Sequence, residues 1–102
     1  ATLGASFTIN ASGVYGISYS DDFAGSADVV GISLNTTTPA TAIQSIAAAE
    51  KLAMSTTANI NYSSTTTIAV YLPAGSVVRA HTSTAQAAGT IAAAQFTITR
   101  LS

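Results

Sequence analysis

The sequence has no cysteine and very little charge. Without cysteine, the chain can form no disulfide bond and no thiolate metal site. Only 7% of its 102 residues are charged, against roughly 25% in an average globular protein. Hydroxyl groups and small side chains must therefore keep the molecule in solution. We expect much of its surface to be buried against other subunits.

Basic residues are few and scattered, which argues against several classes of partner. The only ones are Lys51, Arg79 and Arg100, and the net charge is −1. A nucleic-acid interface needs clustered Lys and Arg to neutralise phosphates, so we expect no nucleic-acid binding. No apolar run approaches the roughly 18 residues of a membrane helix, so we expect no membrane insertion. The length is that of a single domain spanning 1–102.

The stretch 67–80, TIAVYLPAGSVVRA, carries the clearest strand signal. Its first half alternates with a period of two, as in a strand with two different faces. The apolar positions are Ile68, Val70 and Leu72. Pro73 removes a backbone donor and Gly75 can adopt positive φ, so the chain turns here. A second strand begins at Val77, and we predict a strand–turn–strand unit with a four-residue connection.

Other segments also carry strand patterns, and they lie at 7–19, 29–34, 59–67 and 95–101. Within 7–19 we predict a hairpin-like pair or one long strand with a bulge at Gly13. The segments 20–26, 35–39 and 83–90 are loops by composition. The stretch 40–54 is rich in Ala but has no clear apolar stripe, so we predict a loop running into a strand, with a short helical turn around 43–52. Together these segments predict an all-β antiparallel sandwich or barrel.

Three motifs in this order resemble the C1q/TNF-like jelly-roll family. They are Phe7-x-Ile9 with Gly13, Tyr15 and Ile17, then Val70-Tyr71-Leu72-x-Ala74-Gly75-Ser76-x-Val78, and finally Gln95-Phe96-Thr97-Ile98. The resemblance implies an antiparallel jelly-roll fold and a homotrimer packed around an axis. The residues that we expect in the core or the trimer interface are Tyr15, Tyr19, Val70, Tyr71, Leu72, Phe96 and Ile98.

Two departures from the family pattern affect what can be carried over. The strands that precede the Gly-x-Tyr strand in the family are missing or reduced to 1–5. Ser76 stands where the family usually has an acidic residue, so no calcium site is carried over. The low-charge, cysteine-free pattern looks like that of proteins on bacteriophage particles. This step is an analogy, since a fold does not by itself define a function.

No catalytic or metal-binding group emerges from the remaining polar residues. His81 is the only histidine, and no nucleophile elbow or second ligand accompanies it, so we expect a surface or subunit-interface imidazole. Asp21, Asp22 and Asp28 could hold calcium, pair with basic residues of another subunit, or simply be solvated. We expect no cofactor and no metal.

Aromatic residues offer a second kind of candidate site. Tyr15, Tyr19, Tyr62 and Tyr71 could form a carbohydrate platform, but the alternative is that Tyr15, Tyr19 and Tyr71 lie in the core or along the trimer axis. The residues that we expect in loops contacting a partner are Asp21, Asp22, Phe23, Asn35, Tyr62 and His81.

These observations lead to an expected function of the structural class. We expect a non-enzymatic homotrimer on a virion surface, decorating or cementing a phage capsid by contact with the major capsid protein or other virion proteins. One alternative is the receptor-binding head of a tail fibre or tail tip, with a host saccharide as ligand. A second alternative is a soluble bacterial lectin.

Overall fold

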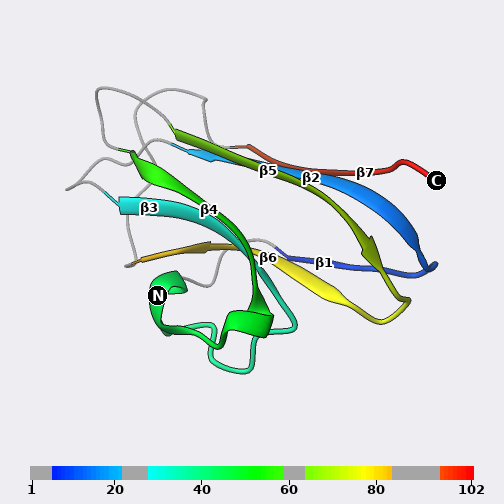
Figure 1. Ribbon diagram of the computed structural model, residues 1–102, viewed down its shortest axis with the longest axis horizontal. Helices are drawn as coiled ribbons and strands as arrows, with labels where there is room; N and C mark the ends of the chain where they lie inside the picture. Colours follow the sequence, from blue (N-terminus) through cyan, green and yellow to red (C-terminus); the bar gives the residue numbers. More distant parts are fainter. Residues whose placement is uncertain (1–5, 22–27, 59–63, 84–94) are drawn as a thin grey trace.

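Two antiparallel sheets form a β-sandwich in the computed structural model, which describes residues 6–21, 28–58, 64–83 and 95–102 (Figure 1). The strands in these ranges are β1 Ser6–Thr8, β2 Gly13–Asp21, β3 Asp28–Leu34, β4 Lys51–Ala58, β5 Ser64–Leu72, β6 Val77–Thr82 and β7 Gln95–Arg100. The four-stranded sheet has the order β1-β6-β3-β4 and the three-stranded sheet the order β5-β2-β7. The predicted all-β antiparallel sandwich is confirmed.

The core lies between the sheets and follows the period-two pattern of the sequence. Tyr15, Ile17 and Tyr19 of β2 are buried on one face, as predicted from their spacing. The other core residues are Ile9, Val30, Ile32, Leu72, Val78 and Ala80. Val70, Phe96 and Ile98 pack against this cluster from the edges of the three-stranded sheet. Burying an aliphatic or aromatic side chain of this size contributes about 1.5–3 kcal/mol, so this cluster dominates the stability of the fold.

The predicted strand–turn–strand unit in 67–80 is confirmed, since β5 ends at Leu72 and β6 begins at Val77. Its two strands do not pair as a hairpin, because β5 and β6 belong to different sheets. The turn between them, with Gly75 at φ 94°, carries the chain from one sheet to the other. The backbone of this turn forms hydrogen bonds with Ile9 and not between β5 and β6. The Gly75 N–H donates to Ile9 O at 2.7 Å, and the Ile9 N–H donates to Ser76 O at 2.8 Å. A period-two pattern identifies strands but does not say which of them pair.

The segment 7–19 also crosses between the sheets, so neither a hairpin nor a bulged strand forms there. β1 pairs with β6, whereas β2 pairs with β5 and β7. Ser12 lies in this crossing, and its Oγ accepts a hydrogen bond from the Ala74 N–H at 2.9 Å. The two crossings therefore lie side by side at one end of the sandwich. The Tyr15 hydroxyl donates to Ala11 O at 2.6 Å at the same end.

Several predicted boundaries are correct and others shift or lie outside the described residues. β2 extends through Ser20 and Asp21, two residues into the predicted loop 20–26. The predicted strand 29–34 is confirmed by β3, and the loop 35–39 by the turn that follows it. The residues 22–27, 59–63 and 84–94, which include the rest of that first loop and most of the predicted loop 83–90, are outside the described ranges.

The prediction for 40–54 is confirmed. Two short 3-10 turns, η1 Ile43–Ser45 and η2 Ala48–Glu50, lead into β4. They lie against the side of the four-stranded sheet that faces away from the core (Figure 1). Ile43 and Ile46 are 0% and 6% exposed there. No helix in the described part of the chain has the length and apolarity to span a membrane.

Gly31 of β3 allows this segment to approach the sheet. A Cβ atom at Gly31 would lie 2.9 Å from Ile43 Cγ1 and 3.0 Å from His81 O. We therefore expect Gly31→Ala to reduce the free energy of unfolding by about 1–3 kcal/mol, the usual cost of overpacking. Urea denaturation would measure this change.

The matched control is Gly16→Ala in β2, where a Cβ would lie at an ordinary 3.5 Å from Leu101 Cδ1. We expect its stability to stay equal to wild type or rise by up to about 1 kcal/mol, because Ala restricts the unfolded chain. Equal stability of the two variants would contradict the close packing at Gly31.

Candidate functional site

The candidate site is the outer face of the three-stranded sheet, which we call the uncharged face. The inner side chains of β2, β5 and β7 face the core, so the alternate positions face outward. The residues of this face are Val14, Gly16, Ser18, Ser20, Thr67, Ala69, Tyr71, Thr97, Thr99 and Leu101. None of these side chains carries a charge.

One end of the uncharged face is apolar and well exposed. Tyr71 lies directly opposite Val14 across the β5–β2 pair. The side chain of Leu101 lies over Gly16. Tyr71 is 60% exposed and Leu101 57% exposed. Two large apolar side chains left in solvent on one sheet face are typical of a surface that contacts another molecule.

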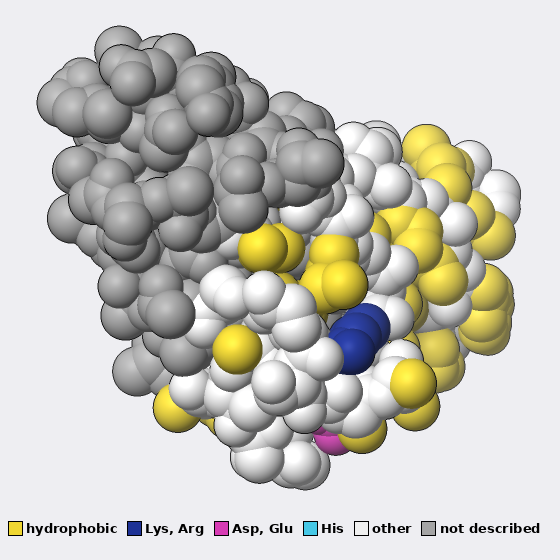
Figure 2. All heavy atoms as spheres, turned by 60° about the vertical axis from the view of Figure 1, so that its left-hand side comes forward, with side chains coloured by type: hydrophobic (Ala, Val, Ile, Leu, Met, Phe, Trp, Pro, Cys, Tyr) yellow, Lys and Arg dark blue, Asp and Glu magenta, His cyan; other side chains and the backbone are white. Residues whose placement is uncertain are grey.

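The other end of the face carries hydroxyl groups. Ser18 is opposite Thr67 on one side and Thr97 on the other. The Thr67 hydroxyl lies 3.4 Å from Ser18 Oγ, to which it donates. Hydroxyl groups both donate and accept hydrogen bonds, so this end can satisfy either polarity in a partner. The rest of the molecule is also poor in charge: the side shown in Figure 2 has few charged side chains among hydrophobic and neutral ones.

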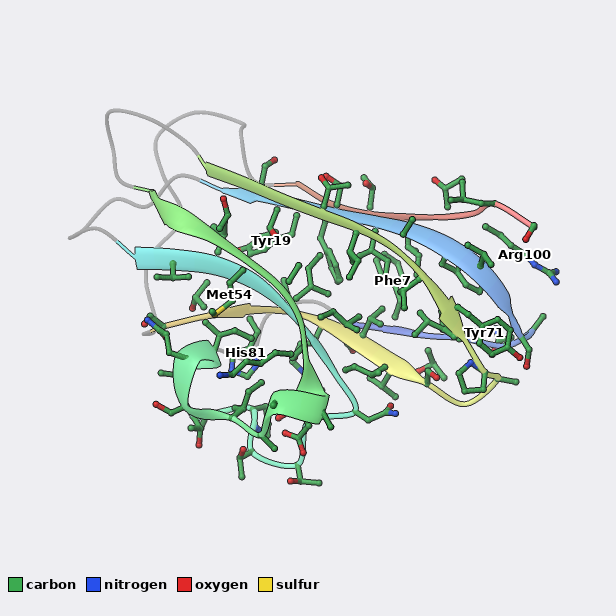
Figure 3. All side chains as sticks on the ribbon, viewed as in Figure 1. Phe7, Tyr19, Met54, Tyr71, His81 and Arg100 are labelled. Carbon is green, nitrogen blue, oxygen red and sulfur yellow. The ribbon has the colours of Figure 1, made fainter. Side chains whose placement is uncertain are left out.

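His81 is buried, so the prediction that it lies on the surface or in a subunit interface is wrong. Its exposure is 0%, as is that of Ser33. The imidazole Nδ1 lies 3.0 Å from Ser33 Oγ and Nε2 lies 2.5 Å from Thr41 O. A carbonyl oxygen can only accept, so Nε2 carries the proton and the Ser33 hydroxyl donates to Nδ1. Figure 3 shows His81 on the side of the four-stranded sheet opposite the core.

This Ser33–His81 pair holds the segment with the 3-10 turns against the sheet. The segment is further attached by the Lys51 ammonium, which donates to Gln44 O at 2.8 Å, and by the Ser83 hydroxyl, which donates to Gln44 Oε1 at 2.6 Å. Because both Ser33 and His81 are fully buried, a substrate has no access to either in the folded chain. The pair acts as a structural connection.

Desolvation by burial lowers the pKa of His81 below its ordinary value. The hydrogen bond to Thr41 O raises that pKa, the positive charge of Arg79 lowers it, and Glu50 raises it, all with smaller effect than burial. The imidazole is therefore neutral in the folded protein at neutral pH. Protonation would place a hydrogen on Nδ1, which now accepts from Ser33.

The residues predicted for the core or trimer interface divide into three groups. Tyr15, Tyr19 and Leu72 are in the core. Val70, Phe96 and Ile98 are half-buried at its border. Tyr71 lies on the uncharged face, so the core alternative is wrong for this residue and only the interface alternative stays open.

The predicted partner-contact residues are not brought together. Asn35 is exposed at a turn with φ 51°, and its Oδ1 accepts from the Val77 N–H at 2.8 Å, so its amide has a structural role. Asp21 ends β2, while Asp22, Phe23 and Tyr62 lie outside the described residues. Tyr15 and Tyr19 face the core and Tyr71 faces away, so these three cannot form a shared carbohydrate platform.

The alternative in which acidic residues bind calcium gains no support from the described residues. Among the residues that the structure describes, no group of three or more His, Asp or Glu side chains could hold a metal ion. The pairing alternatives for the basic residues are partly answered: Lys51 donates to Gln44 O, and Arg100 donates to Ser12 O at 3.0 Å.

Sequence reasoning missed the uncharged face as a unit. Its signal was present, because the outward positions of the three predicted strands are all uncharged. Recognising it required knowing that β2 lies between β5 and β7. Leu101, which follows β7, gave no signal of its own. These three strands also contain most of the motifs that resemble the C1q/TNF-like family.

Comparison with known proteins adds no assignment: no protein-family model, curated protein or solved structure matches this chain. The resemblance to the C1q/TNF-like family therefore stays a prediction.

The buried imidazole makes stability dependent on pH. The unfolded chain takes up a proton at His81 below about pH 6.5, whereas the folded chain does so only at lower pH. Stability is therefore fully present above about pH 6.5 and falls as the pH falls below it. Denaturation by urea at pH 7.5 and pH 5.5 would measure this loss.

The control is His81→Gln, which keeps a donor for Thr41 O and removes the only histidine of the chain. We expect this variant to be less stable by about 1–3 kcal/mol at pH 7.5, because Ser33 loses its acceptor. Its stability should not change between the two pH values. An unchanged pH dependence in His81→Gln would assign the effect to other groups.

Proposed function

We propose that this protein is a non-enzymatic structural component of a virion surface, which assembles as a homotrimer and decorates or cements a phage capsid. The observation that carries the proposal is the uncharged face with its two exposed apolar side chains, Tyr71 and Leu101. A surface of this kind suits permanent contact with another protein better than chemistry on a substrate. The trimer and the virion come from the resemblance to the C1q/TNF-like family.

The composition of the uncharged face favours another copy of the chain as its partner. The cores of protein interfaces are depleted in charged residues and enriched in aromatic ones, and Tyr71 fits this pattern. With the uncharged faces of three copies directed toward a common three-fold axis, no charge is desolvated without a counter-charge. Burying Tyr71 and Leu101 contributes a few kcal/mol, about 1.5–3 for each if burial is complete.

In this proposal, another part of the molecule contacts the capsid. The turn at 35–39 contains exposed residues and lies beyond the end of β3, away from the uncharged face. We infer that it contributes to the capsid-facing end. Asp21 ends β2 at the opposite end of the sandwich, because Asn35 bonds to Val77 near the start of β2, so Asp21 and this turn do not share one end. The major capsid protein is the expected partner there.

A receptor-binding head of a tail fibre is the second candidate function. It is favoured by the combination of the exposed Tyr71 ring with the hydroxyl groups of Ser18, Thr67 and Thr97 on one face. Aromatic rings stack on the C–H faces of sugars, and hydroxyl groups bond to sugar hydroxyls. A soluble lectin would use the same chemistry without a virion.

Substitution on the uncharged face tests the proposal. We expect the wild-type protein to be a trimer by sedimentation and to bind, saturably, capsids stripped of their surface proteins. The double variant Tyr71→Ser with Leu101→Ser should weaken trimer formation about a hundredfold or more, because two apolar contacts are lost. Its fold should be retained, since both side chains are exposed.

The matched control is Met54→Ser, which removes another exposed apolar side chain, 47% exposed, from the other sheet. It should leave the trimer unchanged. Binding to intact host cells, competed by a purified surface polysaccharide, would favour the receptor-binding head. A wild-type monomer that binds neither capsids nor cells would overturn the proposal and the family resemblance with it.

A further inference from the structure

β7 forms an edge of the three-stranded sheet whose backbone groups face outward. It pairs with β2 on one side, in the order β5-β2-β7. The Leu101 N–H donates to Val14 O at 2.7 Å, so these two residues face each other with their backbone groups. This pair determines which residues of β7 bond to β2. Because antiparallel hydrogen bonds alternate along a strand, the N–H and C=O groups of Thr97 and Thr99 face β2. Those of Phe96 and Ile98 face away from it and have no backbone partner among the described residues.

Within the described residues, β7 has few of the features that protect sheet edges from pairing. β7 contains no Pro and no Lys, and its register with β2 has no bulge. Arg100 is its only charged residue, and its guanidinium is engaged with Ser12 O at 3.0 Å and Ser102 O at 3.3 Å. It therefore does not extend over the edge as a free charge.

The other edges of the sandwich differ from β7. β1 is three residues long, and β4 begins at Lys51 and is joined to β3 through two irregularities of register. β5 runs beside β4 of the opposite sheet (Figure 1). β7 thus combines length and regularity with outward backbone groups that have no backbone partner among the described residues.

The core also reaches the surface beside this edge. The rings of Phe7 in β1 and Phe96 in β7 have centroids 5.1 Å apart, and Phe7 is 36% exposed. Phe96 also packs edge-on against Tyr19, with centroids 6.0 Å apart. Figure 3 shows Phe7 and Tyr19 directed into the space between the sheets. A strand added at β7 would shield this aromatic group from solvent.

We propose that β7 pairs antiparallel with β7 of a second copy of the chain, with Ile98 on the two-fold axis. The two three-stranded sheets then form one continuous sheet. The register is self-complementary: Ile98 faces Ile98 of the partner subunit, and Phe96 faces Arg100 of the partner subunit. Thr97 faces Thr99 of the partner subunit, so no like charges meet.

Hydrogen-bond satisfaction and symmetry favour the second copy as the occupant of this edge. In this register the outward N–H and C=O groups of both strands meet each other, which is the mode of strand addition. A two-fold axis uses the same patch on both chains, and the low charge of β7 imposes no repulsion. The backbone contact uses the sheet edge, whereas the proposed trimer uses outward side chains of the uncharged face. Thr97 and Thr99 belong to that face as well, so pairing of β7 is read from the exchange of Ile98 and not from trimer formation.

Amide hydrogen exchange tests the pairing residue by residue. At high protein concentration we expect the N–H groups of Phe96 and Ile98 to be protected, and at low concentration to exchange freely. Those of Thr97 and Thr99 should be protected at both concentrations, because they bond to β2. Protection of Ile98 that does not change with concentration would show that the edge is covered within the chain and overturn the proposal. Free exchange of Ile98 at all concentrations would also overturn it.

Charge variants test the register and the identity of the partner. The variant Thr97→Lys with Thr99→Lys places like charges opposite each other in the proposed pair, as does Thr97→Glu with Thr99→Glu. We expect each variant alone to pair about tenfold more weakly or worse. An equimolar mixture of the two should recover the pairing, because Lys then faces Glu at both positions.

Both variants change exposed side chains, so the fold should be retained, and circular dichroism checks this. The concentration dependence of Ile98 exchange is the readout for each protein and for the mixture. Variants that pair as wild type does, or a mixture that does not recover, would overturn the proposed register.

Discussion

A row of three isoleucines across the three-stranded sheet is the contact on which the rest of the structure depends. Ile17 lies opposite Ile68 of β5 and opposite Ile98 of β7. Ile17 is 1% exposed, between Tyr15 and Tyr19 on the same face of β2. A shift of one residue in either pairing would move an apolar side chain to the outer face and a hydroxyl into the core. The row thus defines the register of both outer strands and, with it, the composition of the uncharged face.

The outer sides of the two sheets are covered differently. The four-stranded sheet is covered by its own chain, through Ile43 packed over Gly31 and through the bond between His81 and Thr41 O. The three-stranded sheet has Tyr71 and Leu101 in solvent. A chain that uses a dedicated segment to cover one sheet, and leaves large apolar groups on the other, is well suited to assembly through the second. This asymmetry is the structural basis of the proposed function.

Local patterns in the sequence were sufficient for the strands and for most of the core. The alternation of Tyr15, Ile17 and Tyr19 identified their buried face, and the weak helical character of 40–54 matched the two 3-10 turns before β4. Pairing could not be predicted this way. The turn at Gly75 has the composition of a hairpin turn, but its hydrogen bonds go to Ile9, which is distant in the sequence.

His81 shows the same limit for a single side chain. Nothing in its neighbourhood in the sequence signals burial, because the groups that enclose it are Ser33 and Thr41, both distant along the chain. The outer face of the three-stranded sheet could likewise not be recognised from the sequence, because this requires knowing that β2 lies between β5 and β7.

The position of β2 has a consequence for how the chain folds during synthesis. β2 is the central strand of its sheet, yet its partners are β5, Ser64–Leu72, and β7, Gln95–Arg100, so it emerges from the ribosome long before either neighbour. β1 is likewise synthesised long before its partner strand β6. Folds dominated by such distant pairings form slowly, in about milliseconds to seconds. Until β5 and β7 have been synthesised, β2 therefore has no partner within its sheet, and the low charge of the chain provides little repulsion between copies during that interval.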